Sequence, residues 1–335
     1  MAGDWQAEIE AAAGRIAGHV RVTPVIDVTL GGFDLTCKLE HMQHTGSFKA
    51  RGAFNTLLAA DVPAGGVVAA SGGNHGAAVG FAAAALGHPA HVFVPEVAGP
   101  SKIALVERTG AACHVVPGLY ADALAAARAH EAATGAMQVH AYDAVPTLAG
   151  QGTVMREWEA QGLDADTVLI AVGGGGLIGG ALAWLDGRRK VVAVESTGTA
   201  TLRAALDAGR PVDVDVGGIA ANALGARRIG ALGFELARGI DAVLVDDDAI
   251  LAARDLLWRE LRCLVEPAGA AGVAALLSGA YRPGPGERVA VLICGANPVR
   301  PVDVRGMQLG IVRNRVDYCE RIASRERHPA GKVRP

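Results

Sequence analysis

The sequence predicts an α/β protein in which mostly parallel sheets are flanked by helices. Strand-like apolar runs alternate with helical runs along the chain, as expected for parallel strands joined by crossover helices. A strand, a glycine-rich turn and a helix follow one another twice, at residues 67–86 and 168–185. Aromatic residues make up only 4% of the chain, whereas glycine occurs 45 times. This composition favours close packing of helices on sheets over an aromatic-rich all-β fold.

The predicted elements follow from this alternation in chain order. Residues 1–20 read as an amphipathic helix, because acidic residues are spaced among alanines. The first group comprises strands at 67–70, 91–95 and 113–116, and helices at 76–86, from about 101, and at 121–134. The pattern restarts with strands at 168–172, 190–195, 242–245 and 289–294. Both groups are typical of parallel sheets.

The repeated unit also predicts how the chain divides into domains. No linker rich in proline, serine or charge separates the two groups of strands. We therefore expect two lobes, a large one formed by 1–58 together with 146–320 and a small one formed by 59–145. The basic end of the chain, 321–335, is expected to fray in solvent.

Composition and charge exclude several classes of protein. A formal net charge of -3 argues against nucleic acid as the main partner. The N-terminal residues lack the basic start and apolar core of a signal peptide, and no apolar run approaches the ~20 residues of a membrane span. The five cysteines form no CxxC pair, which predicts a reducing compartment without a disulfide framework or zinc site. A cytoplasmic protein with a small-molecule partner is expected.

Lys49 is the candidate reactive residue. Gly46 and Ser47 before it suit a turn and a helix cap, so Lys49 falls in the first turn of a helix. An ammonium is disfavoured at this positive end of the helix dipole, and the apolar neighbour Phe48 adds desolvation. Both effects lower the pKa of a lysine, which makes it a candidate Schiff-base nucleophile. Taken alone, such a lysine is more often an ordinary surface residue, so other stretches must decide.

Four consecutive glycines, Gly173 to Gly176, follow a strand and open a helix. Backbone amides without Cβ obstruction converge at such a helix N-terminus and bind anions, phosphate above all. Two interpretations remain open. The spacing of Gly174 and Gly179, with Glu195 about 20 residues on, fits the dinucleotide site of an NAD-dependent dehydrogenase. The alternative is a cofactor with a single phosphate.

Two further stretches place polar side chains at strand ends. The run 71–76 follows a strand, and its amides can hold a carboxylate at a helix N-terminus. Within it, Asn74 can donate to a phenolate oxygen or accept from an ammonium, whereas an isolated His75 is more often a structural hydrogen-bonding residue. Cys294 ends the last strand, where its thiol can face a heteroaromatic nitrogen or simply fill the core.

These stretches together resemble the fold type II pyridoxal-phosphate enzymes. TGSFKARGAFN, SGGNHG, AGQGT, VGGGG and LVEPAGA recur in this order in that family. The sequence is most similar to the branch of serine/threonine dehydratases and serine racemases. Ala50 follows the lysine and His75 follows the asparagine, where cysteine and threonine synthases typically have Asp and Thr. The resemblance implies a two-lobed architecture of the tryptophan synthase β type and pyridoxal 5'-phosphate as the cofactor.

The resemblance implies a role for each candidate residue. Lys49 is expected to bond covalently to the cofactor aldehyde and to act as the base at the substrate Cα. Phe48 is expected to pack on the pyridine ring, Asn74 to bond its phenolic oxygen, and Cys294 to face its nitrogen. The implied phosphate-binding residues are Gly173, Gly174, Gly175, Gly176 and Leu177. The implied substrate-binding residues are Ser71, Gly72, Gly73 and His75.

Departures from the relatives refine these expectations. Gly72 stands where racemases carry a serine that exchanges a proton on the cofactor face opposite the lysine, so racemase activity is not expected. Relatives with a cation site carry two acids near one strand end. Here Glu195 matches the first and remains a candidate ligand, but Thr201 replaces the second, so no metal is expected. Tyr142 and Asp143 occupy a stretch that lines the domain cleft in relatives.

The sequence therefore predicts an ammonia-lyase that removes water from a 3-hydroxy-L-amino acid. The expected substrates are L-threonine and/or L-serine, and the products are a 2-oxo acid and ammonia. Two alternatives use the same cofactor: a dehydratase of a bulkier 3-hydroxy amino acid, and a serine racemase. A third, of another class, is the NAD-dependent dehydrogenase that uses 174–195. A homodimer without nucleic-acid or membrane partners is expected.

Overall fold

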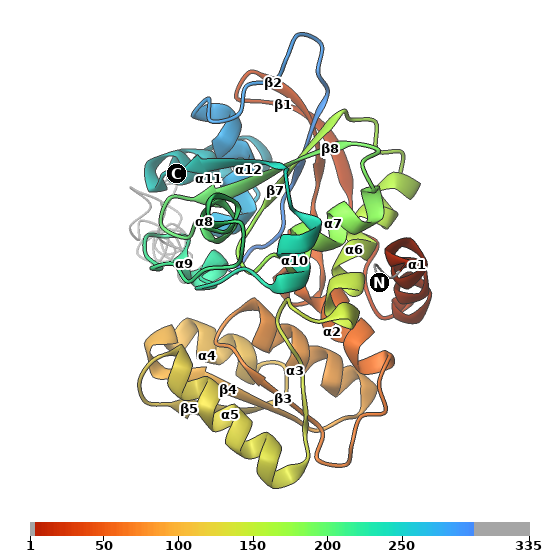
Figure 1. Cartoon of the computed structure of the whole chain (residues 1–335), viewed down its shortest axis with the longest axis vertical. Helices are drawn as coiled ribbons and strands as arrows, with labels where there is room; N and C mark the ends of the chain where they lie inside the picture. Colours follow the sequence, from red (N-terminus) through yellow and green to blue (C-terminus); the bar gives the residue numbers. More distant parts are fainter. Residues whose placement is uncertain (1–3, 298–335) are drawn as a thin grey trace, which may run out of the picture. The chain divides into compact units, whose positions relative to one another are not determined.

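Two sheets with helices against their faces organise the chain. The computed structural model describes residues 4–297, which belong to one compact unit, residues 1–299. Figure 1 shows the strands and the helices that pack on them. This arrangement confirms the predicted α/β fold. The tail predicted at 321–335 and the end of the predicted large lobe lie outside the described residues.

The larger sheet has six strands in the order β1-β2-β10-β7-β8-β9. All its pairings are parallel except that of β1 with β2. Its strands are β1 (Val25–Leu30), β2 (Phe33–Lys38), β7 (Thr167–Ala171), β8 (Lys190–Ser196), β9 (Asp241–Val245) and β10 (Val289–Leu292). The last strand ends two residues before the predicted Cys294, so this cysteine lies in the loop that follows.

The hairpin of β1 and β2 was not predicted, although the sequence carries a signal for it. Gly31 and Gly32 join the two strands, with φ of 61° and 86°. Two successive residues with positive φ make the tight turn that suits the twist of antiparallel strands. Alternation of apolar and polar residues on either side of a Gly-Gly pair is typical of such a hairpin.

Helices cover both faces of the larger sheet. For example, α12 packs against β7, β8, β9 and β10. The helices of this part of the chain are α1 (Trp5–Ile16), α2 (Lys49–Leu58), α6 (Val145–Ala160), α7 (Gly176–Leu185), α8 (Thr201–Ala208), α9 (Ala221–Leu224), α10 (Ala231–Leu236), α11 (Asp247–Leu261) and α12 (Pro267–Leu277). The short helices η1 (Glu40–Met42) and η2 (His44–Gly46) precede α2.

The smaller sheet has four parallel strands in the order β5-β4-β3-β6. Its elements are β3 (Val67–Ala70), α3 (Asn74–Leu86), β4 (Ala90–Pro95), η3 (Glu96–Ala98), α4 (Pro100–Glu107), β5 (Ala112–Val116), α5 (Tyr120–Thr134) and β6 (Met137–Gln138). Helix α5 lies across β3 and β4 (Figure 1). All these elements fall within residues 59–145, while the lobe boundaries remain predictions.

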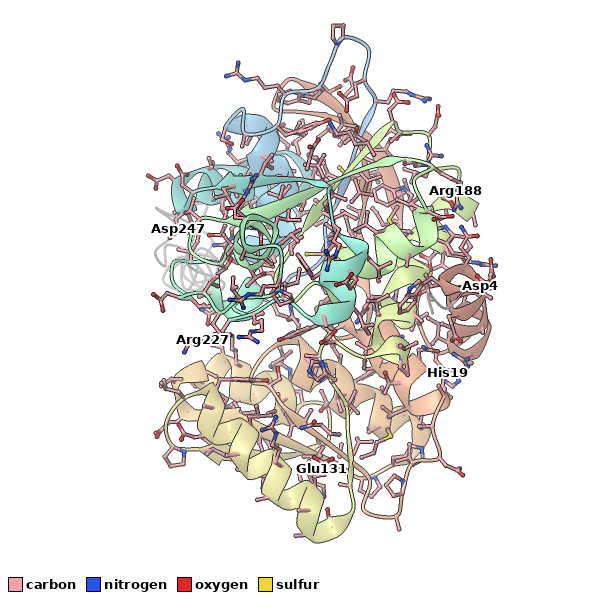
Figure 2. The ribbon with its side chains drawn as sticks, viewed as in Figure 1. Asp4, His19, Glu131, Arg188, Arg227 and Asp247 are labelled. Atoms are coloured by element: carbon pink, nitrogen blue, oxygen red, sulfur yellow. The ribbon has the colours of Figure 1, made fainter. Side chains whose placement is uncertain are left out.

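Charged side chains lie mainly at the surface. Figure 2 labels Asp4, Arg188 and Arg227 at the periphery of the ribbon, where all three are exposed. Buried apolar residues of the larger sheet and of the helices packed on it form one core, which includes the fully buried Trp158. Within residues 4–297, no helix combines the length and the apolar character that crossing a membrane requires.

Candidate active site

A pocket lies where the loops after β7 and β10 meet the start of α2. About 470 Å³ of space not filled by protein atoms, the open mouth included, lies among its lining residues. Of the residues singled out in the sequence, it brings together Phe48, Lys49, Asn74, Gly173, Gly174, Gly175, Gly176, Leu177 and Cys294. Its other lining residues include Tyr142, Ala223, Leu224 and Glu266. The pocket therefore unites segments that lie far apart in the sequence, from Phe48 to Cys294.

Lys49 lies at the first position of α2, as the sequence predicted. Its Nζ atom donates a hydrogen bond to the Ala141 carbonyl at 2.7 Å and lies 5.1 Å from the centre of the Phe48 ring. Desolvation lowers the pKa of Lys49 to about 8, although Cys294 and Glu266 nearby act in the opposite direction. A substantial fraction of unprotonated amine is thus present near neutral pH.

The expected helix cap at Ser47 is wrong. The N-cap residue of α2 is Phe48, and no side chain caps the helix. Ser47 is instead extended, with φ of −160°, and forms a β-bridge with Gly295. The Phe48 amide donates to the Cys294 carbonyl at 3.2 Å. The backbone before Lys49 therefore pairs with the segment after β10, and this pairing replaces a cap as the anchor of the helix start.

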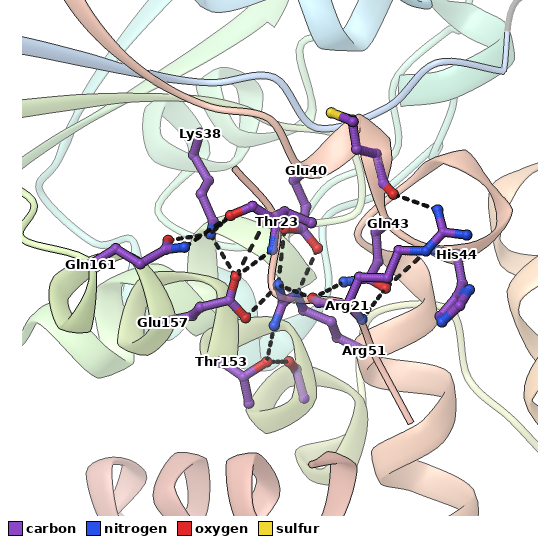
Figure 3. Close-up of polar contacts among 12 residues, drawn as sticks. Arg21, Thr23, Lys38, Glu40, Gln43, His44, Arg51, Thr153, Glu157 and Gln161 are labelled. Carbon is purple, nitrogen blue, oxygen red and sulfur yellow. Dashed lines mark hydrogen bonds and ion pairs between the residues drawn. The ribbon is translucent and has the colours of Figure 1, made fainter. Parts of the chain in front are cut away.

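A buried ion network holds the other side of the same helix turn (Figure 3). Arg51 donates from Nε to Glu40 Oε1 at 2.6 Å, and its Nη2 lies 2.9 Å from Glu157 Oε2. Lys38 Nζ lies 2.6 Å from the other oxygen of Glu157. Arg51, Lys38 and Glu40 are all at most 1% exposed. Because Arg51 follows Lys49 by two residues, the network fixes the helix turn that carries the reactive amine.

The glycine loop 173–176 forms a concave set of backbone amides. Its carbonyls are engaged: that of Gly173 accepts from the Thr201 hydroxyl, and that of Gly174 accepts from the Gly230 amide at 3.0 Å. Within residues 4–297, no group accepts from the amides of Gly174, Gly175 or Gly176. Free amides at the N-terminus of α7 bind an anion.

Side chains are excluded from this loop. A Cβ atom at Gly174 would lie 2.3 Å from the Tyr142 ring, and one at Gly176 would lie 2.9 Å from Tyr142 Cβ. Gly175 has φ of +89°, a conformation that glycine adopts without strain. The loop and the amine of Lys49 together fit a cofactor that carries one phosphate and an aldehyde. They fit the pyridoxal phosphate that the sequence resemblance implies.

Asn74 begins α3 and contacts two polar side chains, of which Glu266 lines the pocket. Its Nδ2 atom donates to Glu266 Oε1 at 2.7 Å, and its Oδ1 atom accepts from Asn297 Nδ2 at 2.7 Å. Glu266 is 3% exposed, and burial raises its pKa to about 7 despite the Asn74 hydrogen bond and the nearby Lys102. A buried carboxyl group with so high a pKa is typical of functional sites.

Cys294 lines the pocket from the loop after β10 and is 2% exposed. Burial, reinforced by the negative charge of Glu266, raises the pKa of its thiol far above the ordinary value. The thiol therefore stays neutral at physiological pH, so it does not offer a ring nitrogen the negative charge of a carboxylate. That it faces this nitrogen remains a prediction.

The loop 71–73 adjoins the pocket, but its residues are not among those that line it. A Cβ atom on Gly72 would lie 2.7 Å from the Ala98 Cβ atom and 2.9 Å from the Val94 Cγ1 atom. The His75 ring bonds the Val139 carbonyl through Nε2 at 2.8 Å, and burial lowers its pKa to about 3. This neutral imidazole has a structural role. The expected binding of a substrate carboxylate by Ser71, Gly72, Gly73 and His75 remains a prediction.

Glu195 lies at the end of β8 and caps α8. Its carboxylate accepts from the backbone amides of Leu202 at 2.7 Å and Arg203 at 2.8 Å. Burial raises its pKa, and these hydrogen bonds oppose that effect. Both carboxylate oxygens of Glu195 are thus engaged by backbone amides, which competes with binding of a ribose hydroxyl or a cation. Among residues 4–297, no cluster of three or more His, Cys, Asp or Glu side chains suits a metal ion.

Three residues of the site, Glu266, Asn297 and Ala141, received no role from the sequence. Glu266 belongs to the quoted run LVEPAGA, where an acid before a proline that opens a helix is a visible signal. Asn297 follows Cys294 by three residues. Ala141 contributes only its carbonyl oxygen, which no side-chain pattern reveals. Tyr142 and Asp143 were noted as cleft residues, and Asp143 accepts from the first amides of α10.

Comparisons with known proteins agree with this site. A family described as pyridoxal-phosphate dependent enzyme matches residues 16–295. The chain is 36% identical over 307 residues to phenylserine dehydratase from Ralstonia pickettii, covering 88% of this chain and 94% of that protein. It is 34% identical over 298 residues to L-threonine ammonia-lyase from Thermotoga maritima, covering 87% and 73%. Maize serine racemase matches the fold with a TM-score of 0.85 at 30% identity, covering 95% and 98%. The chain therefore belongs to the pyridoxal-phosphate dependent enzymes, in the branch of dehydratases, ammonia-lyases and serine racemases.

Proposed function

We propose that this enzyme removes water from a 3-hydroxy-L-amino acid, L-threonine and/or L-serine, and releases a 2-oxo acid and ammonia. The observation that carries the proposal is the desolvated Lys49 amine, with a pKa of about 8, opposite a loop of free glycine amides. The relatives named threonine ammonia-lyase and phenylserine dehydratase support the same reaction class.

The residues of the pocket divide the work of this reaction. When bound, pyridoxal phosphate supplies an aldehyde that bonds to amines and a ring that accepts negative charge from the substrate Cα. The amides of Gly174 to Gly176 would hold the phosphate of this cofactor, and the Ala141 carbonyl orients the Lys49 amine. This amine would accept the proton from the substrate Cα. The neutral thiol of Cys294 would leave the cofactor ring a moderate electron acceptor, which suits loss of the β-hydroxyl.

A substrate panel tests the proposal. Purified holoenzyme is incubated with L-threonine, L-serine, phenylserine and 3-hydroxyaspartate, and the 2-oxo acid and ammonia are measured. Equal amounts of both products from threonine or serine are expected. Failure of all four compounds to yield a 2-oxo acid would refute the proposed reaction.

A bulkier 3-hydroxy amino acid is the second candidate substrate. The relative named phenylserine dehydratase is 36% identical to this chain, and the pocket wall contains Tyr142, Ala223 and Leu224. These side chains offer an apolar surface to an aryl group. A kcat/KM for phenylserine above those for threonine and serine would favour this candidate.

The dehydrogenase and the serine racemase have less support. The family match argues against the NAD-dependent dehydrogenase. Its ribose-binding acid would be Glu195, which instead caps α8. A serine racemase needs a proton-exchanging group at Gly72, which has no side chain and whose missing Cβ atom would meet Ala98 and Val94. Chiral analysis of residual serine checks this, since only L-serine is expected.

Assembly and location belong to the same proposal. We propose a homodimer that acts in the cytoplasm on a free amino acid. The dispersed cysteines support this location. Light scattering of the purified protein measures the assembly, and a mass other than that of two chains would contradict the dimer.

A further inference from the structure

The side chain of Asn74 can be placed in the pocket wall in two ways. Its amide can present either an N–H group or its carbonyl oxygen to the pocket, and a rotation of 180° exchanges the two. Both orientations have nearly the same shape, so packing does not choose between them. The choice nevertheless decides which ligand atom Asn74 can bind, because one orientation donates and the other accepts.

Asn297 lies behind Asn74 and fixes one side of this amide. Asn297 Nδ2 donates to the Thr45 carbonyl at 2.6 Å and to Asn74 Oδ1 at 2.7 Å. A backbone carbonyl only accepts, so Thr45 determines which atom of Asn297 is the nitrogen. Both N–H groups of Asn297 are then engaged, and the atom of Asn74 that faces it must be the oxygen.

Glu266 fixes the other side. Asn74 Nδ2 donates to Glu266 Oε1 at 2.7 Å. In its charged form, which prevails above the pKa of about 7, this carboxylate only accepts, so it requires the same orientation of Asn74 as Asn297 does. The Asn297 backbone amide bonds Glu266 as well. Two independent contacts therefore agree on the polarity of one side chain.

The turn before Lys49 is built around Asn297. Gly46 has φ of +76°, and a Cβ atom there would lie 2.8 Å from Asn297 Oδ1. The Ala296 amide donates to the Gly46 carbonyl at 2.8 Å. The residues that lead into the reactive lysine thus also hold the residue that orients Asn74.

We propose that Asn297 is a positioning residue which, together with Glu266, keeps one N–H group of Asn74 directed into the pocket as a donor to an anionic oxygen of the bound cofactor. One N–H group and the carbonyl oxygen of Asn74 are engaged, and nothing within residues 4–297 accepts from the second N–H group. Asn74 therefore serves a phenolate oxygen. This inference concerns the cofactor and is independent of the substrate that is turned over.

The test compares Asn297→Asp with Asn297→Ala by titrating apoprotein with pyridoxal phosphate at pH 8. An aspartate has no N–H group, so its carboxylate repels Asn74 Oδ1, whereas the rotated amide would set that oxygen against Glu266. Neither orientation then holds the Asn74 N–H group firmly toward the pocket. We expect cofactor affinity to fall about tenfold or more and the absorbance maximum of the bound cofactor to shift. Alanine leaves Glu266 to hold Asn74, so a loss of only about two- to threefold is expected.

This order distinguishes polarity from packing, because Asp matches the shape of Asn far better than Ala does. A greater loss for Asn297→Ala than for Asn297→Asp would overturn the proposal. Wild-type affinity and absorbance in Asn297→Asp would also overturn it. Asn222→Asp is the matched control, since it adds the same charge beside Lys102 without contacting Asn74. It is expected to keep the absorbance maximum and an affinity within about twofold of wild type.

A second pair of variants covers the case in which Asn297→Asp does not fold. Glu266→Gln retains an oxygen that accepts from Asn74, whereas Glu266→Leu has none. We expect Glu266→Gln to bind the cofactor about tenfold more tightly than Glu266→Leu. Equal affinities of these two variants, with circular dichroism confirming that both are folded, would overturn the proposal.

Discussion

Two lysines near one helix turn, the fully buried Lys38 and the partly buried Lys49, show how the protein separates stability from reactivity. Lys38 donates to the Thr23 carbonyl, Glu157 and Gln161, so three acceptors satisfy its three N–H groups. Lys49 has one such partner, the carbonyl of Ala141. Desolvation lowers the pKa of both lysines, but the hydrogen bond to Glu157 opposes that effect at Lys38. An ammonium group whose three N–H groups all have acceptors serves the structure, whereas one with N–H groups left without acceptors is available for chemistry.

The glutamates near these lysines differ in the same way. Arg51 and Lys38 lower the pKa of Glu157 despite its burial, so this carboxyl group stays charged. Glu266 has amide partners instead, and burial raises its pKa to about 7. Burial alone therefore does not make a charged group reactive. The number of opposite charges in contact decides whether a buried group is locked in its charged form or can exchange a proton.

The largest effect should come from replacing each of the two lysines by methionine in turn. Lys49→Met removes the nucleophile, so turnover should fall by at least about a thousandfold, and the visible absorbance of the cofactor–lysine adduct should vanish. The free energy of unfolding should not fall, because only one hydrogen bond is lost. Lys38→Met should show the reverse: a lower unfolding midpoint and retained turnover per folded molecule. Steady-state kinetics and urea unfolding measure both, and 2-oxo acid production by Lys49→Met would contradict the comparison.

Arg51→Met sharpens the structural half of the comparison. It leaves Glu40 and part of Glu157 buried without their cation, so the free energy of unfolding should fall by roughly 3–5 kcal/mol. Arg238→Met is the control, because Arg238 forms an exposed pair with Glu235, and solvent screens such pairs so that they contribute little to stability. Similar losses in the two variants, measured by urea unfolding, would show that burial does not distinguish these pairs.

Gly174→Ala tests how closely the pocket is packed. The new methyl group would meet the Tyr142 ring, so cofactor binding should weaken by roughly 1–3 kcal/mol. The double variant Gly174→Ala with Tyr142→Ala should recover most of this loss, because it removes the clash. Gly217→Ala is the control, since its Cβ atom would meet nothing within 4 Å. Fluorescence titration of apoprotein gives the affinities, and unchanged binding by Gly174→Ala would contradict the observed packing.

The smallest effect is a pH dependence set by Lys49. Only the unprotonated amine attacks the cofactor aldehyde, and the pKa of about 8 sets its fraction. The rate of cofactor capture by apoprotein should therefore rise about tenfold per pH unit below pH 8 and level off above it. Dividing by the rate of a free lysine derivative at each pH removes the titration of the cofactor itself. The divided rate should therefore be level below pH 8 and fall above it, and a divided rate that stays level up to about pH 10 would exclude the lowered pKa.

The sequence singled out candidate residues where the signal lies among neighbouring residues. Lys49, Asn74 and the glycine loop each follow a turn or a strand end, and the resemblance to a family implied their roles. Glu266 and Asn297 were missed because their effect arises through Asn74, which is 192 and 223 residues away in sequence. No local pattern encodes such a chain of contacts.

The ion network was equally hidden. Lys38 and Glu157 are 119 residues apart, and each reads as an ordinary surface charge within its own segment. The Ser47 cap failed for a related reason: its hydroxyl suits a cap, but the backbone pairs with Gly295. Long-range pairing determined both outcomes.

The surroundings of Gly72 limit how this enzyme can evolve. Its α-carbon faces Val94 and Ala98 so closely that a side chain there has no room. A single substitution that placed a hydroxyl-bearing side chain at this position would clash with Ala98 and Val94. Interconversion of mirror-image amino acids is thus separated from this scaffold by at least two coordinated changes, one to clear the space and one to install the new group.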